Sequence, residues 1–115
     1  MIKHHLVEGI LKIVLNRPEK KNAFTNGMYR ELTQILSEGD QNPHVKVILI
    51  SGAGNAFSAG NDIADFMKSP ITHEDAPPIN LLKTLAGLGK PLIAAVDGVA
   101  VGIGATLLFH CDLVY

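Results

Sequence analysis

The fold is decided by residues 91–110, PLIAAVDGVAVGIGATLLFH, in which an apolar run leads through a glycine-containing turn into a second apolar stretch. The run Pro91–Val96 is apolar and bounded by turn residues, which is typical of a strand buried on both faces. Asp97-Gly98 ends that strand, and a helix is expected from about Gly102 to His110. A strand followed by a turn and a helix is the repeating unit of α/β proteins, so this stretch predicts that fold class.

Outside that stretch, strands and helices are predicted to alternate along the chain. Each strand is a short apolar or alternating run, and each helix has apolar residues at helical spacing. The expected strands are 2–7, 10–16, 45–51 and 112–115, and the expected helices are 26–38, 62–67 and 79–88. The first two strands should form a hairpin around Glu8-Gly9. This order favours an α/β fold with substantially parallel strands, and 115 residues suffice for a single domain.

Several local features refine this prediction. Thr25 is a suitable N-cap for the helix 26–38, because its hydroxyl can accept a hydrogen bond from a first-turn amide. Residues 51–60 are predicted to form a long loop, and residues 69–78, with three prolines, a mobile one. The helix 79–88 is expected to bury one apolar side. That side consists of Ile79, Leu82, Leu85 and Ala86.

Composition excludes several classes of function. Hydrophobic residues make up 47% and charged residues 18%, which indicates a globular chain rather than a disordered one. The formal net charge is −1 and Trp is absent, so neither a basic nucleic-acid surface nor a base-stacking platform is expected. No apolar run reaches the roughly 18 residues of a membrane-spanning helix, so no membrane partner is expected. The N-terminus lacks the apolar region of a signal peptide and Cys111 has no partner for a disulfide, so a cytoplasmic location is expected.

Individual titratable residues do not indicate a metal site. The histidines share no spacing that metal ligands require; they occupy positions 4, 5, 44, 73 and 110. Cys111 lies in an apolar stretch, which favours a buried and unreactive thiol. Asp62 stands at the start of the helix 62–67, where its side chain would cap the first turn. No metal ion is therefore expected.

Two glycine-bearing turns are the best candidates for a functional site. They lie at 56–63, AFSAGNDI, and at 96–106, VDGVAVGIGAT, and each follows a buried strand and leads into a helix. Glycine allows a backbone to approach a ligand closely, and the first amides of a helix have no intrahelical partner. If the two turns converge, two free N–H groups can stabilise one negative oxygen, which is the arrangement of an oxyanion hole.

Other interpretations of these glycines were compared with the sequence. Glycine between a strand and a helix often does no more than shape the turn. A P-loop requires lysine and then serine or threonine after its last glycine, whereas Gly60 is followed by Asn61. A dinucleotide-binding fingerprint requires a third glycine, but the sequence has Leu107 at that place after Gly102 and Gly104. Both phosphate-binding motifs are therefore poor matches.

Three linked motifs carry a family resemblance. The chain contains NRP at 16–18 with NAF at 22–24, FSAGNDI at 57–63, and KPLIAAVDG at 90–98. In order and spacing these motifs resemble the crotonase superfamily, the enoyl-CoA hydratase/isomerase group. Residues 99–108, VAVGIGATLL, are most similar to the branch that contains Δ3,Δ2-enoyl-CoA isomerases. The resemblance implies a crotonase-like α/β spiral of ββα units that is incomplete at its C-terminal end, with residues 1–115 as the N-terminal part of one acyl-CoA-binding domain.

The resemblance also implies roles for individual residues. The backbone N–H groups of Asn61 and Ile103 would form the oxyanion hole for the thioester carbonyl of an acyl-CoA or enoyl-CoA substrate. The residues that would flank the CoA part or line the acyl side are Pro18, Ala23, Phe24, Ser58, Ala59, Gly60, Ile63, Phe66, Met67 and Gly102. Coenzyme A would belong to the substrate, and no further cofactor would be needed.

One departure from the family pattern bears on the reaction. Hydratases of this family carry a glutamate at the place of Thr106, and a hydroxyl cannot act as a carboxylate does near neutral pH. The second glutamate of the family, which isomerases use as their proton shuttle, would lie beyond Tyr115. The resemblance therefore favours an isomerase-type proton shift over hydration, with a non-catalytic acyl-CoA-binding or protein-interaction module as a further alternative. The 115 residues alone are expected to be inactive, and the full-length protein is expected to be a homotrimer or hexamer.

Overall fold

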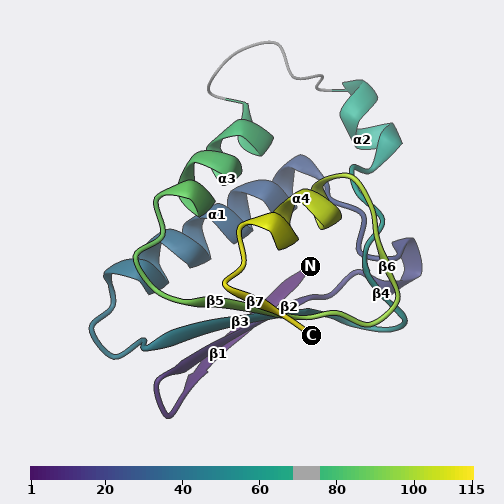
Figure 1. Ribbon diagram of the computed structural model, residues 1–115. Helices are drawn as coiled ribbons and strands as arrows, with labels where there is room; N and C mark the ends of the chain where they lie inside the picture. Colours follow the sequence, from purple (N-terminus) through teal and green to yellow (C-terminus); the bar gives the residue numbers. More distant parts are fainter. Residues whose placement is uncertain (69–75) are drawn as a thin grey trace.

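The computed structural model describes residues 1–68 and 76–115 (Figure 1). Strands and helices follow one another along these residues. The strands are β1 (Ile2–Val7), β2 (Ile10–Leu15), β3 (Val47–Gly52), β4 (Ala56–Ser58), β5 (Leu92–Ala95), β6 (Val99–Ala100) and β7 (Leu113–Val114). The helices are α1 (Asn26–Gln41), α2 (Ile63–Lys68), α3 (Pro77–Ala86) and α4 (Ile103–Phe109), and a short 3-10 helix (Pro18–Lys20) precedes α1.

Five of the strands form the central sheet, in the order β1-β2-β3-β5-β7. β1 and β2 are antiparallel, with Ile2 opposite Leu15 and Val7 opposite Ile10, which confirms the predicted hairpin. The pairs β2–β3, β3–β5 and β5–β7 are all parallel, so the predicted parallel arrangement is also confirmed. In Figure 1, α1, α3 and α4 lie on one side of this sheet, where they connect successive parallel strands.

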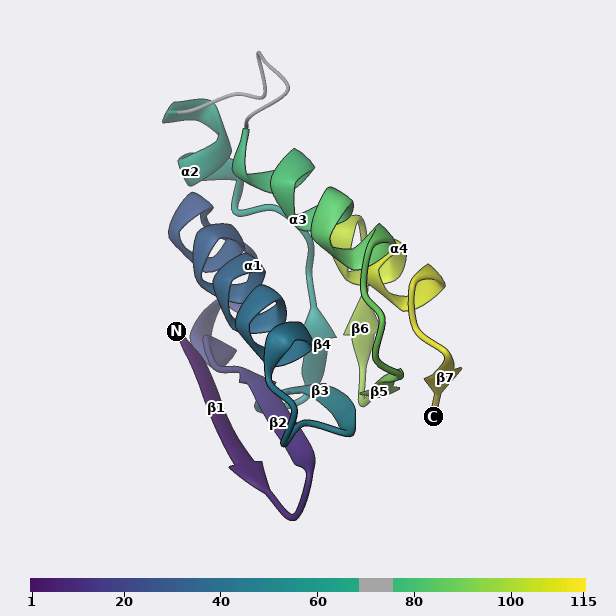
Figure 2. The same ribbon diagram turned by 90° about the vertical axis from the view of Figure 1, so that its left-hand side faces the viewer.

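A second, two-stranded sheet contains β4 and β6, which lie side by side (Figure 2). These strands are parallel, with Ala56 opposite Val99 and Ser58 opposite Ala100. The chain thus repeats a strand–strand–helix unit, as β1-β2-α1, as β3-β4 with α2 and α3, and as β5-β6-α4. The prediction of a continuous loop over 51–60 is wrong, because β4 lies within it. A strand of three residues is too short to give a periodic signal in the sequence.

The core lies between the central sheet and the helices. The buried residues of β2 are Leu11, Ile13 and Leu15, as the predicted alternation requires. The predicted apolar side of α1 is buried as well, and it consists of Met28, Leu32, Ile35 and Leu36. These two faces belong to one hydrophobic cluster, so the first strand–strand–helix unit is packed by side chains that the sequence pattern identifies.

The ends of α1 follow from local chemistry. Thr25 Oγ1 accepts a hydrogen bond from Met28 N–H at 3.1 Å, which confirms the predicted N-cap. The helix continues to Gln41, three residues beyond its predicted end at 38. It ends where Asn42 adopts an extended conformation, because the following Pro43 disfavours helical angles in the residue before it.

α3 begins earlier than predicted and buries a different side. It begins at Pro77, because the missing N–H of proline has no intrahelical role in the first turn. Residues 69–75, for which a mobile loop is predicted, lie outside the described residues. The buried side chains of α3 are Pro78, Leu81 and Leu85, whereas Leu82 is half-buried and Ala86 is exposed. Because apolar residues occur nearly all around this helix, periodicity alone does not determine which side faces α1.

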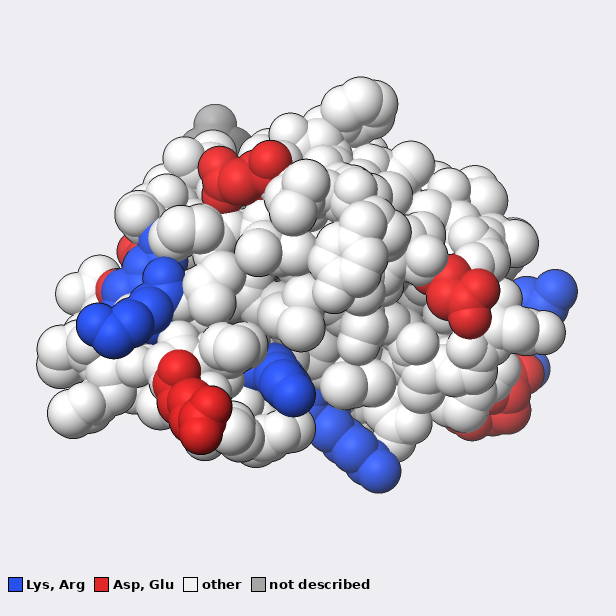
Figure 3. Space-filling view, turned by 60° about the horizontal axis from the view of Figure 1, so that its bottom comes forward, with Lys and Arg blue, Asp and Glu red and all other residues white. Residues whose placement is uncertain are grey.

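Charged side chains are dispersed over the surface. On the face shown in Figure 3, basic and acidic groups are interspersed, with large uncharged areas between them. Within the ranges 1–68 and 76–115, no helix is long and apolar enough to cross a membrane. Some apolar side chains on α2 and α4 are strongly exposed, namely Ile63 at 78%, Met67 at 75% and Phe109 at 89%.

One buried polar side chain connects the loop before α1 to the segment around β4. Asn22 is fully buried, and its Oδ1 accepts a hydrogen bond from Arg17 N–H at 2.8 Å. Its Nδ2 donates to the carbonyl oxygens of Ala53 and Ala56, both at 2.9 Å. The Ser58 hydroxyl donates to the Asn22 carbonyl oxygen at 2.9 Å. This single residue therefore fixes the position of its loop against β4.

Replacing Asn22 with alanine should lower the free energy of unfolding by roughly 2–4 kcal/mol, because one buried and one partly buried carbonyl oxygen lose their donor. A urea titration followed by circular dichroism measures the change. Gln34→Ala is the control, since Gln34 is exposed and its side chain bonds to that of Glu38 on the same helix face. Its effect should stay within about 0.5 kcal/mol. Equal unfolding midpoints for the two variants would contradict the structural role of Asn22.

Candidate active site

The two glycine-bearing turns lie against each other at the ends of β4 and β6. Val101 N–H donates to the carbonyl oxygen of Ser58 at 3.0 Å. A Cβ built on Gly60 would stand 3.1 Å from the Val101 oxygen, and one built on Gly102 would stand 3.6 Å from the Cα of Gly60. The two segments expected from the sequence to converge are therefore in contact.

Both glycines have backbone angles that other residues rarely adopt. Gly60 has a φ of +96°. Gly102 has φ 59° and ψ −122°, and Gly104 N–H donates to the Val101 oxygen at 2.9 Å. These values describe a type II′ turn with Gly102 in its first central position, where glycine is strongly preferred. The sequence places glycine at each point where the backbone requires it.

The direction of the Asn61 N–H is set by the other side of its own peptide unit. The Gly60 carbonyl oxygen accepts a hydrogen bond from Phe24 N–H at 2.7 Å, and Asp62 N–H donates to the Phe24 oxygen at 2.8 Å. In a trans peptide the N–H points opposite to the C=O, so the Asn61 N–H points away from Phe24. Among the described residues it has no hydrogen-bond partner.

The Ile103 N–H is held in the same manner. The carbonyl oxygen of Gly102, in the same peptide unit, accepts a hydrogen bond from Thr106 N–H at 2.9 Å. Ile103 is the first residue of α4, so its N–H has no intrahelical acceptor. Within the described part of the chain this N–H has no other partner either. Two adjacent turns thus each present one unpaired donor.

Two of the predicted site residues can contribute only through their backbone. The Phe24 side chain is buried and packs on the ring of Tyr29, with 4.9 Å between the ring centroids. The Ser58 hydroxyl is fully buried, bonded to the Asn22 oxygen and accepting from Gly60 N–H at 3.2 Å. Of the other residues in these segments, Pro18 is exposed and Ala23 and Ala59 are half-buried.

The residues predicted to line the acyl side are exposed on α2. Ile63, Phe66 and Met67 have exposed fractions of 78%, 37% and 75%, although all three are large and apolar. Their helix begins two residues after Asn61. Thr106, the residue at the place of a hydratase glutamate, is half-buried in the first turn of α4. An apolar surface therefore follows one of the two donors, Asn61, directly along the chain.

Both carboxylate oxygens of Asp62 have a partner. Oδ1 accepts a hydrogen bond from Asp65 N–H at 2.9 Å, which confirms the predicted helix cap. Oδ2 lies 2.8 Å from Arg17 Nη1. The Asp65 N–H bond and the Arg17 guanidinium hold the pKa of this carboxyl below its usual value. Although Asp62 is adjacent to Asn61, it is therefore a weak base.

Sequence reasoning assigned no role to three residues that support this site, although Arg17 and Asn22 belong to the first motif. The third is Tyr29, whose hydroxyl donates to Asn61 Oδ1. Tyr29 is 2% exposed, and burial raises its pKa well above the usual range, so it remains a protonated donor. Its only sequence signal is a polar tip on the apolar side of α1.

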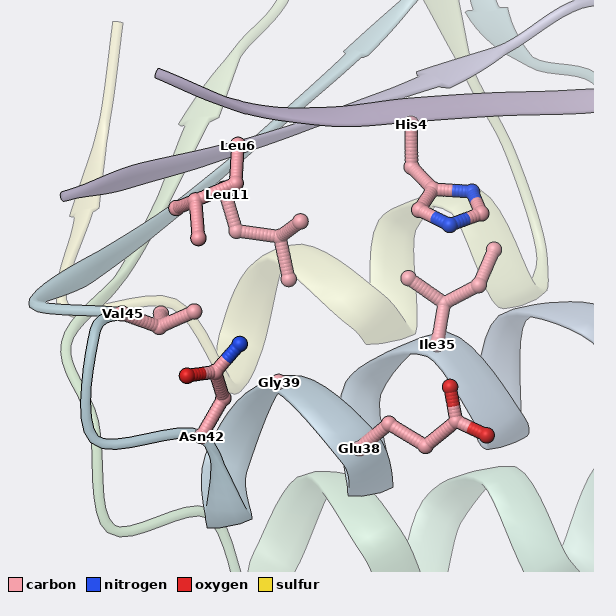
Figure 4. A pocket seen from close by; sticks show the side chains of 8 residues that line it. All are labelled: His4, Leu6, Leu11, Ile35, Glu38, Gly39, Asn42 and Val45. Carbon is pink, nitrogen blue, oxygen red and sulfur yellow. The ribbon is translucent and has the colours of Figure 1, made fainter. Parts of the chain in front are cut away.

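A polar hollow of about 260 Å³ lies next to the first turn. It is lined by Arg17, Lys20, Thr25, Asp62, Ala64, Asp65 and Lys68. A separate hollow of about 180 Å³ lies between the β1–β2 hairpin and α1 (Figure 4). Its lining combines the polar residues His4 and Glu38 with several apolar side chains. It includes no residue of either glycine turn. The two hollows are therefore distinct.

The other residues considered for a role, Cys111 and His110, contact backbone oxygens of α4. Cys111 is half-buried, its thiol lies 3.5 Å from the Leu107 oxygen, and burial raises its pKa to about 11, so it is unreactive at neutral pH. His110 ends α4, and its Nδ1 lies 3.2 Å from the Thr106 oxygen. No group of three potential metal ligands occurs among the residues whose positions are described.

Comparison with known proteins identifies similar chains. Residues 6–115 match the family model for enoyl-CoA hydratase/isomerase. The 1,2-epoxyphenylacetyl-CoA isomerase of Escherichia coli (strain K12) is 36% identical over 98% of this chain and 46% of its own length. The enoyl-CoA delta isomerase 2 of Homo sapiens is 38% identical over 94% of this chain and 29% of its own.

Solved structures show the same similarity. The crystal structure of an enoyl-CoA hydratase/isomerase from Pseudoalteromonas atlantica T6c has a TM-score of 0.92 to this chain and is 33% identical. The match covers 99% of this chain and 45% of that one. The chain therefore spans less than half the length of each of these three proteins.

The contact between α4 and β4 can be tested with a pair of glycine variants. A Cβ on Gly104 would stand 2.8 Å from the Ser58 oxygen, so Gly104→Ala should lower stability by about 1–3 kcal/mol. Gly27→Ala is the matched control, because Gly27 is also the second residue of its helix and its nearest neighbour would be 3.7 Å away. That change should be neutral or stabilising by up to about 1 kcal/mol. Thermal unfolding compares them, and equal effects would show that close packing at Gly104 is not required.

Proposed function

The chain belongs to the enoyl-CoA hydratase/isomerase family, and on that premise we propose that it binds an acyl-CoA thioester and stabilises its enolate. Its α/β structure is part of the crotonase fold. The observation that carries the proposal is the pair of unpaired N–H groups, on Asn61 and Ile103, at two turns in contact. Both would donate to the thioester oxygen, which becomes negative when a neighbouring proton is removed.

The fixed peptide units explain why these donors would be effective. Donors that are already oriented need no reorganisation as charge develops, and this is the usual source of oxyanion stabilisation. Hydrogen bonds at the Gly60 and Gly102 carbonyl oxygens supply that orientation. Loss of one such donor costs on the order of 10²–10³ in rate in a studied protease.

The surroundings of the turns fit the two ends of an acyl-CoA. We assign the CoA part to the side of Pro18–Phe24, where Arg17, Lys20 and Lys68 line the polar hollow beside Asn61. The hollow also contains Asp62 and Asp65, and Arg17 is paired with Asp62, so Lys20 and Lys68 are the cations that suit the phosphate groups of CoA. We assign the acyl part to α2, where Ile63 and Met67 are exposed and apolar.

An isomerase-type proton shift is the reaction that the residues favour. A 1,3-proton shift needs one base that removes a proton and returns it, whereas hydration is served best by two positioned carboxylates. Thr106 offers no carboxylate at α4, and Asp62 is engaged by Arg17 and Asp65. The E. coli and human relatives are both named as isomerases. A glutamate beyond residue 115 would supply the base.

The proposed proton shift also bears on the cofactors that the protein needs. Deprotonation and reprotonation of a thioester transfer no electrons, so we propose that neither a redox cofactor nor a metal ion takes part. We also propose that the full-length protein acts in the cytoplasm as a homotrimer or hexamer.

The first functional test concerns binding. The full-length protein should bind butyryl-CoA more tightly than free CoA, because only the thioester has a carbonyl for the two N–H groups. Ile103→Pro should lose most of this preference, since proline deletes the donor at a helix position that tolerates it. Ile103→Ala should retain the preference, because it changes only the side chain. Isothermal titration calorimetry measures the affinity of each of the three proteins for both ligands. Equal affinity of the unmodified protein for butyryl-CoA and free CoA would remove the oxyanion hole from the mechanism.

The second functional test concerns the reaction. The full-length protein should convert 3-enoyl-CoA to 2-enoyl-CoA faster than it hydrates 2-enoyl-CoA, and residues 1–115 alone should do neither. Thr106→Ala should change isomerisation little, because the hydroxyl is not the base. Hydration well above isomerisation would mean that another residue supplies the second carboxylate. Binding without turnover would favour the non-catalytic acyl-CoA-binding module.

A further inference from the structure

We propose that Arg17 is a positioning residue that polarises the Asn61 N–H through two intervening peptide units. The proposal rests on the function proposed above, in which that N–H binds the thioester oxygen. Arg17 acts without contact to the reacting atoms. Its influence passes through backbone groups that are hydrogen-bonded in series.

The hydrogen bonds form a continuous chain. Arg17 Nη1 donates to the carbonyl oxygen of Ala23 at 2.9 Å. That carbonyl shares a peptide unit with Phe24 N–H, which donates to the Gly60 oxygen at 2.7 Å. The Gly60 carbonyl shares the next peptide unit with Asn61 N–H. A cation therefore stands at one end of the chain and the unpaired donor at the other.

A cation at the start of such a chain makes the last N–H a stronger donor. Arg17 draws electron density toward the Ala23 oxygen, so Phe24 N–H becomes more positive and polarises the Gly60–Asn61 unit in turn. Hydrogen bonds in series strengthen one another by roughly 10–30% per bond.

The chain is largely shielded from water. The Arg17 side chain is only 15% exposed, Ala23 is half-buried, Phe24 is 1% exposed, and Gly60 is buried. Water would otherwise screen the guanidinium and compete for the carbonyl oxygens. Burial of the links allows the charge of Arg17 to act on the far end.

Asp62 provides a competing explanation for any effect of Arg17. The same Nη1 lies 2.8 Å from Asp62 Oδ2, and an uncompensated carboxylate beside Asn61 would repel a negative thioester oxygen. Lys20 and the Asp65 N–H also favour the charged form of this carboxyl. Neutralising Asp62 and polarising the peptide chain are separate effects, and a double variant distinguishes them.

The test is isotope-edited infrared spectroscopy of the full-length protein saturated with butyryl-CoA that carries ¹³C at its thioester carbonyl. Stronger donors to the carbonyl oxygen move its stretching band to lower frequency, so the band reports the Asn61 and Ile103 N–H groups directly. In Arg17→Gln the shift relative to free ligand should be smaller by roughly 5–15%, because one of the two donors loses roughly 10–30% of its strength. The kcat for isomerisation should fall several-fold, and by less than the roughly 10²–10³ expected for loss of a whole donor.

Further variants distinguish polarisation of the peptide chain from neutralisation of Asp62. Arg17→Lys, which keeps the charge, should restore part of the shift. Arg17→Gln combined with Asp62→Asn should keep the reduced shift, and recovery to the unmodified value would overturn the proposal by assigning the role of Arg17 to Asp62. If Arg17→Gln alone does not fold, the double variant is compared with the unmodified protein instead, because replacing Asp62 removes the carboxylate that Arg17 would have left unpaired. Arg30→Gln is the matched control, because Arg30 is an exposed arginine on α1, and its shift should be unchanged.

The outcomes for the two proposals differ. If the unmodified protein shifts the band and Arg17→Gln shifts it equally, the peptide chain does not transmit the charge and the proposal for Arg17 fails alone. If the unmodified protein does not shift the band, the oxyanion hole fails and the role of Arg17 fails with it.

Discussion

The buried amide group of Asn22 is the interaction on which the rest of the candidate site depends. It donates to the Ala53 and Ala56 carbonyl oxygens, at the two ends of the turn between β3 and β4, and the bond to Ala56 is buried. Its own backbone has a φ of +58°, which asparagine tolerates better than most residues. Because Ser58 bonds back to the Asn22 carbonyl, the strand that leads to Gly60 is fixed by the same residue.

The structure also determines the direction in which the N–H groups of the two turns point. The Gly60 and Gly102 carbonyl oxygens accept from Phe24 N–H and Thr106 N–H. The N–H groups on the opposite edges of the two peptide units point away from these donors and have no partner among the described residues. The positive φ of each glycine allows the two backbones to approach without a Cβ between them. One site thus combines a strand-end turn with a helix start, and neither turn alone provides two donors.

The candidate site offers hydrogen-bond donors and an apolar surface, whereas the carboxylate beside the donors is already engaged. Its donors and its exposed apolar residues on α2 suit a thioester oxygen and an acyl chain. The carboxylate beside the donors, Asp62, instead holds Arg17 and the first turn of α2. This division agrees with a chain that spans less than half the length of the relatives it matches. In the function proposed above, this segment contributes the oxyanion donors, and the base is assigned to a residue outside it.

The sequence by itself determined the α/β class, the β1–β2 hairpin, the buried side of α1 and the two glycine turns, because apolar period and glycine position are local properties. It did not determine β4 and β6, which are too short for a period, or the buried side of α3, which is apolar nearly all around. Only the tertiary structure decided which N–H groups remain unpaired and what Arg17, Asn22 and Tyr29 do. Arg17 has local partners in Asn22 and Ala23, but the other partners lie far away in sequence, from Ala53 to Asp62. Tertiary packing brings these distant groups within hydrogen-bond distance.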